Sequence, residues 1–399
     1  MCGGYHRIGE NNLDDIIKNK ATFRENIRNL FAYRNSPNSV RTELLKEIVT
    51  KIDKSYKTVG LVGIGLEGAI IKIRDYADTE KVIKIADPHL NEEGRKTQKL
   101  FGIIKVQTET ENDFRDRFVN GCKIQKELSD IITREQINYF GVPGNVNVSF
   151  DPGLYIEMEF IHGVDVIRHI ANKKDIKYSL NLYYQLLKSV EFYQNFGYIH
   201  RDIKPENIII SGISEKNRKV VIIDWTMSKI VGIKGHTMMG TCLGTLPYTP
   251  DKLIVDGEAK DANLSDDVFN LGIMMYEFCN NKKAPKAKNP ELLRTSKSSR
   301  KQYFGYLRKY IPEYLVPLYD KAIAPEHERF QTVEPFAYEF LQVLKRQGMY
   351  DDSEWGIDIT EKSDLEQKIN NLEARIEKTE EMIKKVICSL GTISNTLNN

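Results

Sequence analysis

The chain has 399 residues, of which 41% are hydrophobic and 29% are charged, so it is long enough for two lobes with a sizeable core. Its formal net charge of +2 gives no reason to expect a nucleic-acid partner. The five cysteines are scattered without a CxxC pair or a disulfide framework, and no stretch approaches about 18 apolar residues. We therefore expect a globular, cytoplasmic protein without a membrane anchor.

Residues 1–57 are polar and mostly helical in pattern, which predicts an N-terminal helical extension. Apolar residues recur at helical spacing from Val40 to Ile52, and Ser39 is a candidate N-cap for this helix. From Thr58 the pattern changes to short β-rich runs separated by Gly or charged turns, at residues 59–62, 69–73 and 81–86. These runs predict an antiparallel sheet in the region of residues 58–163.

Two features of the predicted sheet concern phosphate. Residues 63–70 read GIGLEGAI, and Gly63, Gly65 and Gly68 would let backbone N–H groups approach phosphate oxygens without a Cβ in the way. A strand follows them, which disfavours a dinucleotide-binding fold, and a plain glycine-rich hairpin is the alternative. Lys84 lies in the run KVIKIA on the same strand face as Val82, where a solvated lysine is the alternative.

Helical patterns dominate residues 164–347, for example at residues 178–196 and 268–279. Residues 281–300 are rich in Lys, Ser, Asn and Pro and are predicted to form an exposed loop. A strand-rich half followed by a helix-rich half predicts an α+β chain with two lobes and a cleft between them.

The most informative stretch is YIHRDIKPENIII at residues 198–210. Asp202, Lys204 and Asn207 stand there between β-branched runs, the arrangement needed to orient a hydroxyl nucleophile, neutralise a transferring phosphate and hold a magnesium ion. A charged surface turn is the alternative. The stretch resembles the catalytic loop of eukaryotic-like serine/threonine protein kinases, and the resemblance covers roughly residues 58–345. It implies a bilobal kinase fold with a small antiparallel-sheet N-lobe and a helical C-lobe.

The resemblance implies a role for each matched residue. Asp202 would orient the substrate hydroxyl and accept its proton, Lys204 and Lys84 would stabilise phosphate charge, and Asn207 with Asp224 would bind Mg²⁺. ATP would further contact the glycines Gly63, Gly65 and Gly68, the strand residues Ile70 and Val82, the hinge residues Glu159 and Ile161, and Asp165 through its ribose. For Asp165, an exposed loop residue is the alternative.

One departure from the kinase pattern concerns Lys84. Kinases pair this lysine with a Glu on the next helix, but the best hydrophobic register of residues 114–128 puts Asn120 or Gly121 at that place. Glu127 is reachable only in a poorer register, so the partner of Lys84 stays open.

A second departure is Trp225-Thr226, which replaces the usual Phe-Gly after the metal-binding Asp. An Asp-Trp pair also resembles small-molecule phosphotransferases related to aminoglycoside and choline kinases. Three other features favour a protein hydroxyl as the acceptor: Lys204, the segment GTLPY at residues 244–248, and the helix start SDDVFNLG at residues 265–272.

The segment around residues 224–250 is the expected regulatory element. Arg201 would bind a phosphorylated activation segment, with Thr237 and Thr241 as candidate phosphosites, although a plain loop threonine is equally compatible with either position. Asp251 is expected to pair with Arg329 late in the domain.

Residues 348–399 are predicted to form a linker and a coiled-coil tail. Apolar residues alternate at spacings of four and three from Leu365 to Leu397, with isoleucine at three a positions. The repeat predicts a parallel homodimer through residues 365–397. One amphipathic helix packed on the kinase domain is the alternative.

The primary hypothesis is an ATP- and magnesium-dependent kinase that phosphorylates Ser/Thr hydroxyls of proteins, autophosphorylates and dimerises through its tail. A nucleotide-binding pseudokinase scaffold is the first alternative, supported by the missing helix Glu and by Trp225-Thr226. A small-molecule phosphotransferase is the second alternative, and it rests on Asp224-Trp225 alone.

Overall fold

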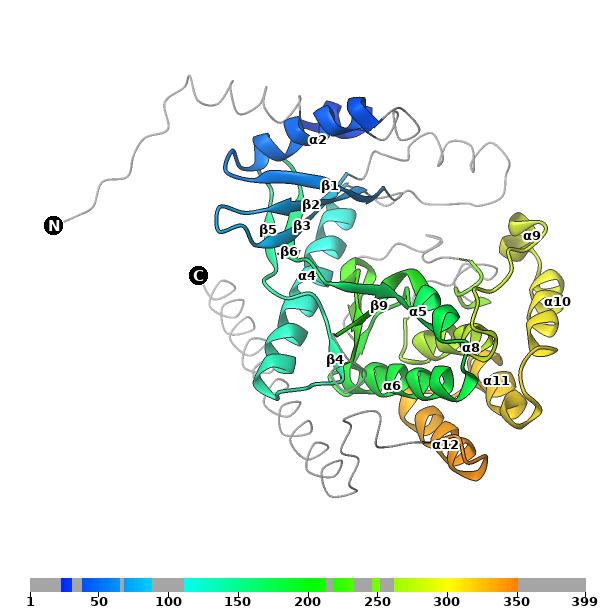
Figure 1. Ribbon diagram of the computed structural model, residues 1–399. Coiled ribbons are helices and arrows are strands. Elements are labelled where there is room, and N and C mark those ends of the chain that lie inside the picture. Colours follow the sequence, from blue (N-terminus) through cyan, green and yellow to red (C-terminus); the bar gives the residue numbers. More distant parts are fainter. Residues whose placement is uncertain are drawn as a thin grey trace, which may run out of the picture.

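The computed structural model describes residues 23–30, 38–64, 68–87, 111–212, 218–232, 246–251 and 262–350. These residues form two lobes, a smaller one built on a sheet and a larger one built from helices (Figure 1). Gly65, Thr237, Thr241 and the tail at residues 365–397 lie outside the described residues. The predictions for these positions, including the coiled coil, therefore stay predictions.

The N-lobe is built on a five-stranded antiparallel sheet. Its spatial order is β1 (Lys57–Ile64), β2 (Gly68–Arg74), β3 (Glu80–Ala86), β6 (Tyr155–Glu159) and β5 (Asn147–Ser149). The three strands predicted at residues 59–62, 69–73 and 81–86 are confirmed with slightly longer bounds. Strand alternation puts Ile83 and Ile85 on one face of β3 and Val82 and Lys84 on the other.

Helices cover both faces of this sheet. On one face, the helix at residues 23–30 and α2 (Asn38–Ile52) bury apolar side chains, such as Phe23 and Ile48, against the sheet. On the other face lies α4 (Glu111–Arg134), whose Phe114 and Phe118 are buried against Val82. The sheet is thus the middle layer of the lobe. Because α2 begins at Asn38, Ser39 lies inside its first turn and not at the N-cap, a shift of two residues.

The C-lobe is mainly helical. Its helices are α5 (Val166–Lys173), α6 (Ile176–Gln194), α8 (Ser265–Asn280), α9 (Pro290–Thr295), α10 (Lys297–Arg308), α11 (Val316–Ile323) and α12 (Val333–Arg346), with a 3-10 turn η4 (Glu313–Leu315). α6 and α8 are buried along almost their whole length and form the centre of the lobe, and this confirms the helices predicted at residues 178–196 and 268–279. No helix in the described part of the chain is long and apolar enough to cross a membrane.

The loop predicted at residues 281–300 is only partly correct. Its second half contains α9 and the start of α10. Local signals account for these helices, since Pro290 occupies the first position of α9 and the Ser296 hydroxyl caps α10 by accepting from the Ser299 N–H at 3.2 Å. In α10 the polar side chains of Lys297 and Ser298 are exposed, whereas Arg300 is buried.

Short strands between the lobes position the functional residues. β4 (Phe140–Gly141), β10 (Lys219–Ile222), β9 (Ile208–Ser211) and β7 (Gly163–Asp165) form a second sheet, and β8 (Tyr198–Ile199) pairs with β11 (Lys229–Ile230). β9 and β10 are antiparallel, and the Ile223 N–H donates to the Asn207 carbonyl at 2.9 Å. The loop before β9, with the 3-10 turn η1 (Pro205–Asn207), therefore lies beside the end of β10 and the turn η3 (Trp225–Met227).

Candidate active site

The loop that carries Asp202 is held in place by hydrogen bonds to α8. Asp267, at the start of α8, accepts hydrogen bonds from the backbone N–H groups of His200 at 2.9 Å and Arg201 at 2.8 Å, and from the Tyr193 hydroxyl at 2.8 Å. Burial raises the pKa of Asp267 to about 6, although these hydrogen bonds favour its charged form. The helix start at residues 265–272 therefore holds the loop.

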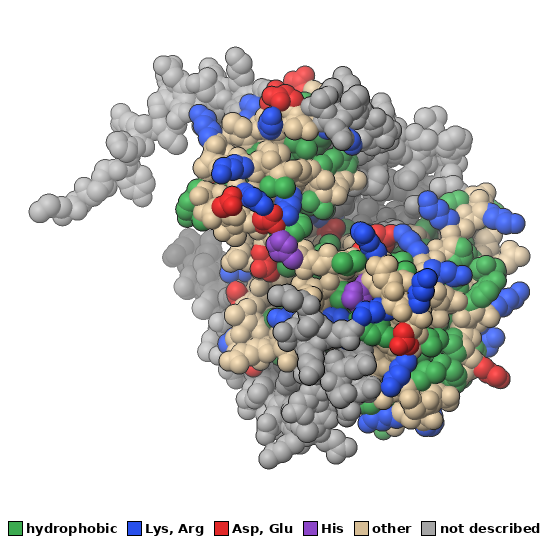
Figure 2. Space-filling view, in the orientation of Figure 1, with side chains coloured by type: hydrophobic (Ala, Val, Ile, Leu, Met, Phe, Trp, Pro, Cys, Tyr) green, Lys and Arg blue, Asp and Glu red, His purple; other side chains and the backbone are tan. Residues whose placement is uncertain are grey.

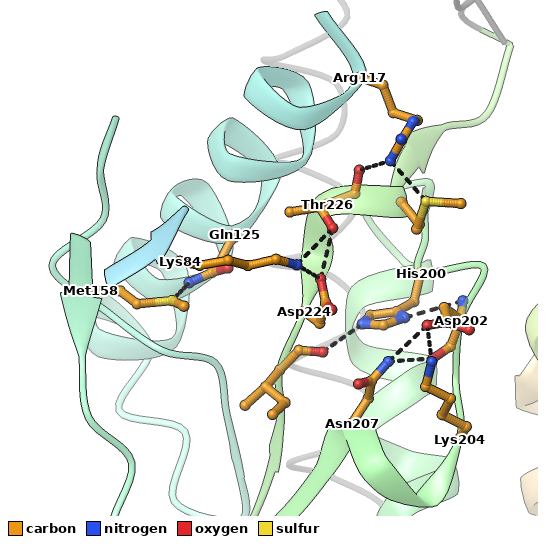
Figure 3. A network of polar contacts seen from close by, with 12 residues as sticks. Lys84, Arg117, Gln125, Met158, His200, Asp202, Lys204, Asn207, Asp224 and Thr226 are labelled. Carbon is orange, nitrogen blue, oxygen red and sulfur yellow. Dashed lines mark hydrogen bonds and ion pairs between the residues drawn. The ribbon is translucent and has the colours of Figure 1, made fainter. Parts of the chain in front are cut away.

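Three side chains converge within this loop (Figure 3). Lys204 Nζ lies 2.5 Å from Asp202 Oδ2, and Asn207 Nδ2 donates to the same oxygen at 3.1 Å and to the Asp202 carbonyl at 2.8 Å. Burial raises the pKa of Asp202 above its ordinary value, and Lys204 and Asn207 partly oppose this rise. An oriented carboxyl group of this kind can accept a proton from a hydroxyl that is placed next to it.

Lys84 reaches from β3 to the end of β10. Its Nζ lies 2.5 Å from Asp224 Oδ1 and 3.1 Å from Thr226 Oγ1, and the Thr226 hydroxyl donates to the same Asp224 oxygen at 2.7 Å (Figure 3). Burial alone would raise the pKa of Asp224, but the charge of Lys84 and these hydrogen bonds outweigh it and hold the pKa well below its ordinary value. Asp224 is therefore ionised at neutral pH.

None of the residues predicted on α4 pairs with Lys84. Asn120 is exposed, and Glu127 is hydrogen-bonded to the Tyr198 hydroxyl. Gly121 lies so close to the turn η3 that an added Cβ would stand 2.1 Å from the Trp225 carbonyl oxygen and 2.7 Å from the Thr226 Cα. The position that would carry the Glu thus has no room for a side chain, and Asp224 and Thr226 are the partners of Lys84.

α4 is nevertheless joined to the site. Arg117 NH1 donates to the Thr226 carbonyl at 3.3 Å and lies 2.8 Å from the sulfur of Met227 (Figure 3). Further along the helix, Gln125 Nε2 donates to the Pro143 carbonyl at 2.8 Å. The helix is therefore positioned by backbone contacts and by an arginine, and not by an ion pair with β3.

Trp225 is a buried packing residue. Its Nε1 donates to the Ile222 carbonyl at 2.9 Å, and its ring makes edge contacts with Tyr193 and His200. His200 Nδ1 is 3.4 Å from the Asp202 N–H, while its Nε2 lies 3.1 Å from the Ile223 carbonyl. Burial lowers the pKa of His200 to about 4, so a neutral ring connects the loop of Asp202 to Ile223 at the end of β10. Trp225, which stands in place of the usual Phe, leaves the carboxylates of Asp202 and Asp224 in position.

The neighbouring strands β2, β3 and β6 carry Ile70, Val82 and Glu159, three of the residues predicted to contact ATP. Val82 on β3 lies opposite Met158 on β6 in one apolar cluster, against which Ile70 packs from β2. Glu159 ends β6, where its N–H donates to the Gly144 carbonyl at 3.1 Å and its side chain accepts from the Gly144 N–H at 2.7 Å. The end of β6 is therefore firmly held at the start of the predicted hinge.

Other predicted nucleotide ligands have structural roles as well. Asp165 caps α5 by accepting from the Arg168 N–H at 3.0 Å, and Ile161 is partly exposed in the segment between β6 and β7. A Cβ at Gly68 would lie 1.7 Å from the Ile85 carbonyl oxygen, so glycine allows β2 to approach β3, whereas a Cβ at Gly63 would meet nothing within 4 Å. Their contacts with ATP stay predictions.

The expected pair of Asp251 and Arg329 is wrong. Asp251 forms its ion pair with Arg300, which is fully buried on α10. Arg329 instead donates to the carbonyl oxygens of Ala324 and Ser265 at distances of 2.8–3.0 Å. The error follows from the loop predicted at residues 281–300, which offered no buried arginine.

Tyr248, which lies three residues before Asp251, is held by α8. The Tyr248 hydroxyl donates to Glu277 Oε1 at 2.6 Å, and Asn270 Nδ2 donates to the Tyr248 carbonyl at 2.6 Å. Burial raises the pKa of Glu277 to about 8, so this carboxyl is mainly neutral at pH 7. The end of the GTLPY segment is therefore anchored to the same helix that fixes the Asp202 loop.

A family model described as a protein kinase domain matches residues 56–347. The chain belongs to the protein kinase family. This kinase is 34% identical over 175 residues to a probable myosin light chain kinase of Dictyostelium discoideum, which covers 43% of this chain and 41% of the relative. It is 31% identical over 125 residues to human calcium/calmodulin-dependent protein kinase type 1B, covering 31% of this chain and 34% of the relative. The kinase thus matches less than half the length of either protein.

The donor atoms of this kinase fit magnesium. Asp224 offers an ionised carboxylate, and the amide nitrogen of Asn207 is engaged by Asp202, so the amide oxygen is the atom with ligand chemistry. Magnesium takes few protein carboxylates and completes its shell with phosphate oxygens and water. Accordingly, the described residues contain no group of three or more His, Cys, Asp or Glu that could hold a metal.

Proposed function

We propose that this kinase transfers the γ-phosphate of ATP to Ser or Thr hydroxyls of proteins, with magnesium as its cofactor. The observation that carries the proposal is that one site contains both Asp202 with Lys204 and Asn207, and Asp224 with Lys84. Phosphoryl transfer needs little covalent chemistry from the protein, because positioning and charge neutralisation supply most of the rate. Both sets of groups are present.

Each residue has a distinct task in the proposed reaction. Asp202 orients the substrate hydroxyl and accepts its proton, while Lys204, 2.5 Å away, adds positive charge where the phosphate passes. Lys84 stabilises charge on the phosphates of ATP, and Asn207 and Asp224 hold the metal. Bound Mg²⁺ would neutralise the negative charge that develops on the phosphates.

A nucleotide-binding pseudokinase is the second candidate, and Gly121 is the observation that favours it. The contact of Gly121 with the backbone of Trp225 and Thr226 leaves Lys84 without a carboxylate from α4. Against this candidate, Thr226 and Asp224 already hold the Lys84 ammonium within the site. A small-molecule phosphotransferase has weaker support, because Trp225 is a packing residue.

We also propose that the kinase autophosphorylates at Thr237 or Thr241 and dimerises through residues 365–397. A parallel coiled coil would hold two kinase domains at a high local concentration, on the order of millimolar, and so favour phosphorylation between them. The heptad pattern of the tail supports this proposal.

The test of the proposed function is incubation of the full-length protein with labelled ATP and Mg²⁺, followed by mass spectrometry of the modified residues. The proposal predicts phosphoserine or phosphothreonine on the protein itself or on an added protein substrate. Nucleotide binding without any transfer would support the pseudokinase. Transfer to aminoglycosides or choline, with none to protein, would support the small-molecule enzyme.

A further inference from the structure

The charge of this chain is very unevenly distributed. Residues 282–310 contain ten Lys and Arg and a single Glu, a net charge of +9, in a chain whose total is +2. The remaining 370 residues hold 48 basic and 55 acidic residues and are therefore net negative, at −7. Figure 2 shows Lys and Arg side chains gathered over the part of the C-lobe where α9 and α10 lie. We call the exposed lysines of residues 282–309 the basic surface.

The backbone beneath the basic surface is held in place. The segment between α8 and α9 is tied to α8 by the Ala284 N–H, which donates to Glu277 Oε1 at 3.0 Å. It is tied to α10 by the Tyr303 hydroxyl, which donates to the Pro285 carbonyl at 2.7 Å. The lysines are therefore presented at fixed positions, which lowers the entropy lost when a partner binds.

Several of these lysines have no acidic partner in the part of the chain that the structure describes. Lys286, Lys288, Lys301 and Lys309 are exposed, and within the described ranges of the chain none of them pairs with a carboxylate. Charges of one sign gathered on a rigid surface repel each other and attract a polyanion, with a strength that falls as salt is added. An exposed cluster of this kind is a binding surface for a negatively charged partner.

The basic surface borders the active site. Lys283 forms an ion pair with Glu206, which lies in the turn between Lys204 and Asn207. On α10, the same helix that carries Lys301, Arg300 pairs with Asp251, three residues after the GTLPY segment. A partner bound to these lysines is therefore next to the place where a substrate hydroxyl would meet Asp202.

We propose that the basic surface is a docking site for an acidic segment of the protein substrate, a proposal that rests on the protein kinase activity proposed above. Its position favours a substrate over other polyanions. A membrane bound to lysines at this place would lie against the entrance of the site and hinder a protein substrate. An acidic stretch of the substrate itself binds here while its hydroxyl lies at Asp202, so the contact raises the local concentration of the acceptor.

Binding is tested first, because it does not depend on catalysis. The probes are a fluorescent peptide with one serine and about eight Asp and Glu, and its counterpart with Asn and Gln. The full-length protein should bind the acidic peptide at least about tenfold more tightly than the neutral peptide. Its affinity for the acidic peptide should decrease as the salt concentration is raised from about 50 mM to about 200 mM. The triple variant Lys286→Glu, Lys288→Glu, Lys301→Glu should lose this preference. The variant Lys54→Glu, Lys57→Glu reverses exposed lysines of the N-lobe and should keep it.

Equal binding of the acidic peptide by wild type and the triple variant would overturn the proposal. So would binding of polyuridylate RNA or phosphatidylserine vesicles through these lysines without binding of the acidic peptide. In the kinase assay, the wild type should phosphorylate the acidic peptide with a several-fold higher kcat/KM than the neutral one, and the triple variant should treat both alike. Transfer to both peptides with equal kcat/KM contradicts the docking site alone, whereas peptide binding without any transfer contradicts the kinase activity.

Discussion

Lys84 Nζ lies 2.5 Å from Asp224 Oδ1, and both atoms contact the hydroxyl of Thr226. Among the described residues, these two side chains are the hydrogen-bonding partners of Lys84. The lysine proposed to stabilise the phosphates is therefore positioned by the segment proposed to bind the metal, and α4 approaches this segment through Gly121 without contributing a carboxylate. The positions of the Lys84 and Asp224 side chains thus depend on each other and on Thr226.

The first prediction concerns the Thr226 hydroxyl. Thr226→Val keeps the shape of the side chain but removes both hydrogen bonds, each worth about 1 kcal/mol. We expect kcat to fall about tenfold, because a barrier increase of about 1.4 kcal/mol corresponds to that factor. Thr226→Ser retains the hydroxyl and should stay within about threefold of wild type on the same scale. Steady-state kinetics with varied ATP measures kcat for both variants. Equal kcat values for Thr226→Val and wild type would exclude a role of the Thr226 hydroxyl in positioning Lys84.

The second prediction concerns the close contact at Gly121. Gly121→Ala places a Cβ 2.1 Å from the Trp225 carbonyl oxygen, so the helix or the turn must move. We expect a loss of about 1–3 kcal/mol in the free energy of unfolding, as for other overpacked sites. Urea denaturation measures this loss, and Asn120→Ala at the neighbouring exposed position should change stability little. An unchanged Gly121→Ala protein would show that α4 does not approach this closely.

The third prediction is a pH effect from Glu277. Burial raises its pKa to about 8 in the folded protein, above the ordinary 4.5. A raised pKa means that the neutral form stabilises the fold fully below pH 4.5, and that this contribution is lost as the pH rises through about 8. Glu277→Gln keeps a neutral acceptor for Tyr248 and does not titrate. Its melting temperature should match wild type near pH 5 and exceed it increasingly towards pH 8. A constant difference across this range would contradict the raised pKa.

The fourth prediction tests the tail. Truncation after residue 350 should convert a dimer to a monomer and slow autophosphorylation at low protein concentration. Ile376→Asp should have the same effect, because it buries an unpaired carboxylate at an a position of the coil. Light scattering measures the mass of each protein. The same mass for full-length, truncated and Ile376→Asp proteins would mean that the tail packs on its own kinase domain.

The catalytic loop could be predicted because its information is local. Asp202, Lys204 and Asn207 lie within six residues of one another, and the runs on either side of them form the strands β8 and β9. The N-lobe strands were predictable for a similar reason, since their alternation and glycine turns are visible in short windows. The sequence signal for these parts lies in short windows, although Asp267 holds the folded loop from 66 positions away.

The partners of Lys84 and Asp251 could not be predicted, because they depend on distant contacts. Lys84 meets Asp224 from 140 positions away, and the choice was decided by how closely Gly121 approaches the turn η3. Arg300 lies in a polar stretch that reads as a loop, and only packing against α8 reveals it as a buried partner of Asp251. A hydroxyl two residues after the Asp predicted to bind the metal is a signal in the sequence that could have pointed to Thr226.

The most direct test of the account compares wild type with Asp202→Asn. The substitution removes the proposed proton acceptor but preserves the shape of the side chain, and it leaves unchanged Lys84, Asn207 and Asp224, the residues proposed to hold nucleotide and metal. We predict that phosphoryl transfer in a single-turnover assay with labelled ATP falls by at least about a hundredfold, while the affinity for Mg-ATP changes by no more than about threefold. A mutant that transfers phosphate at a rate comparable to wild type would contradict the assignment of Asp202 and, with it, the proposed site.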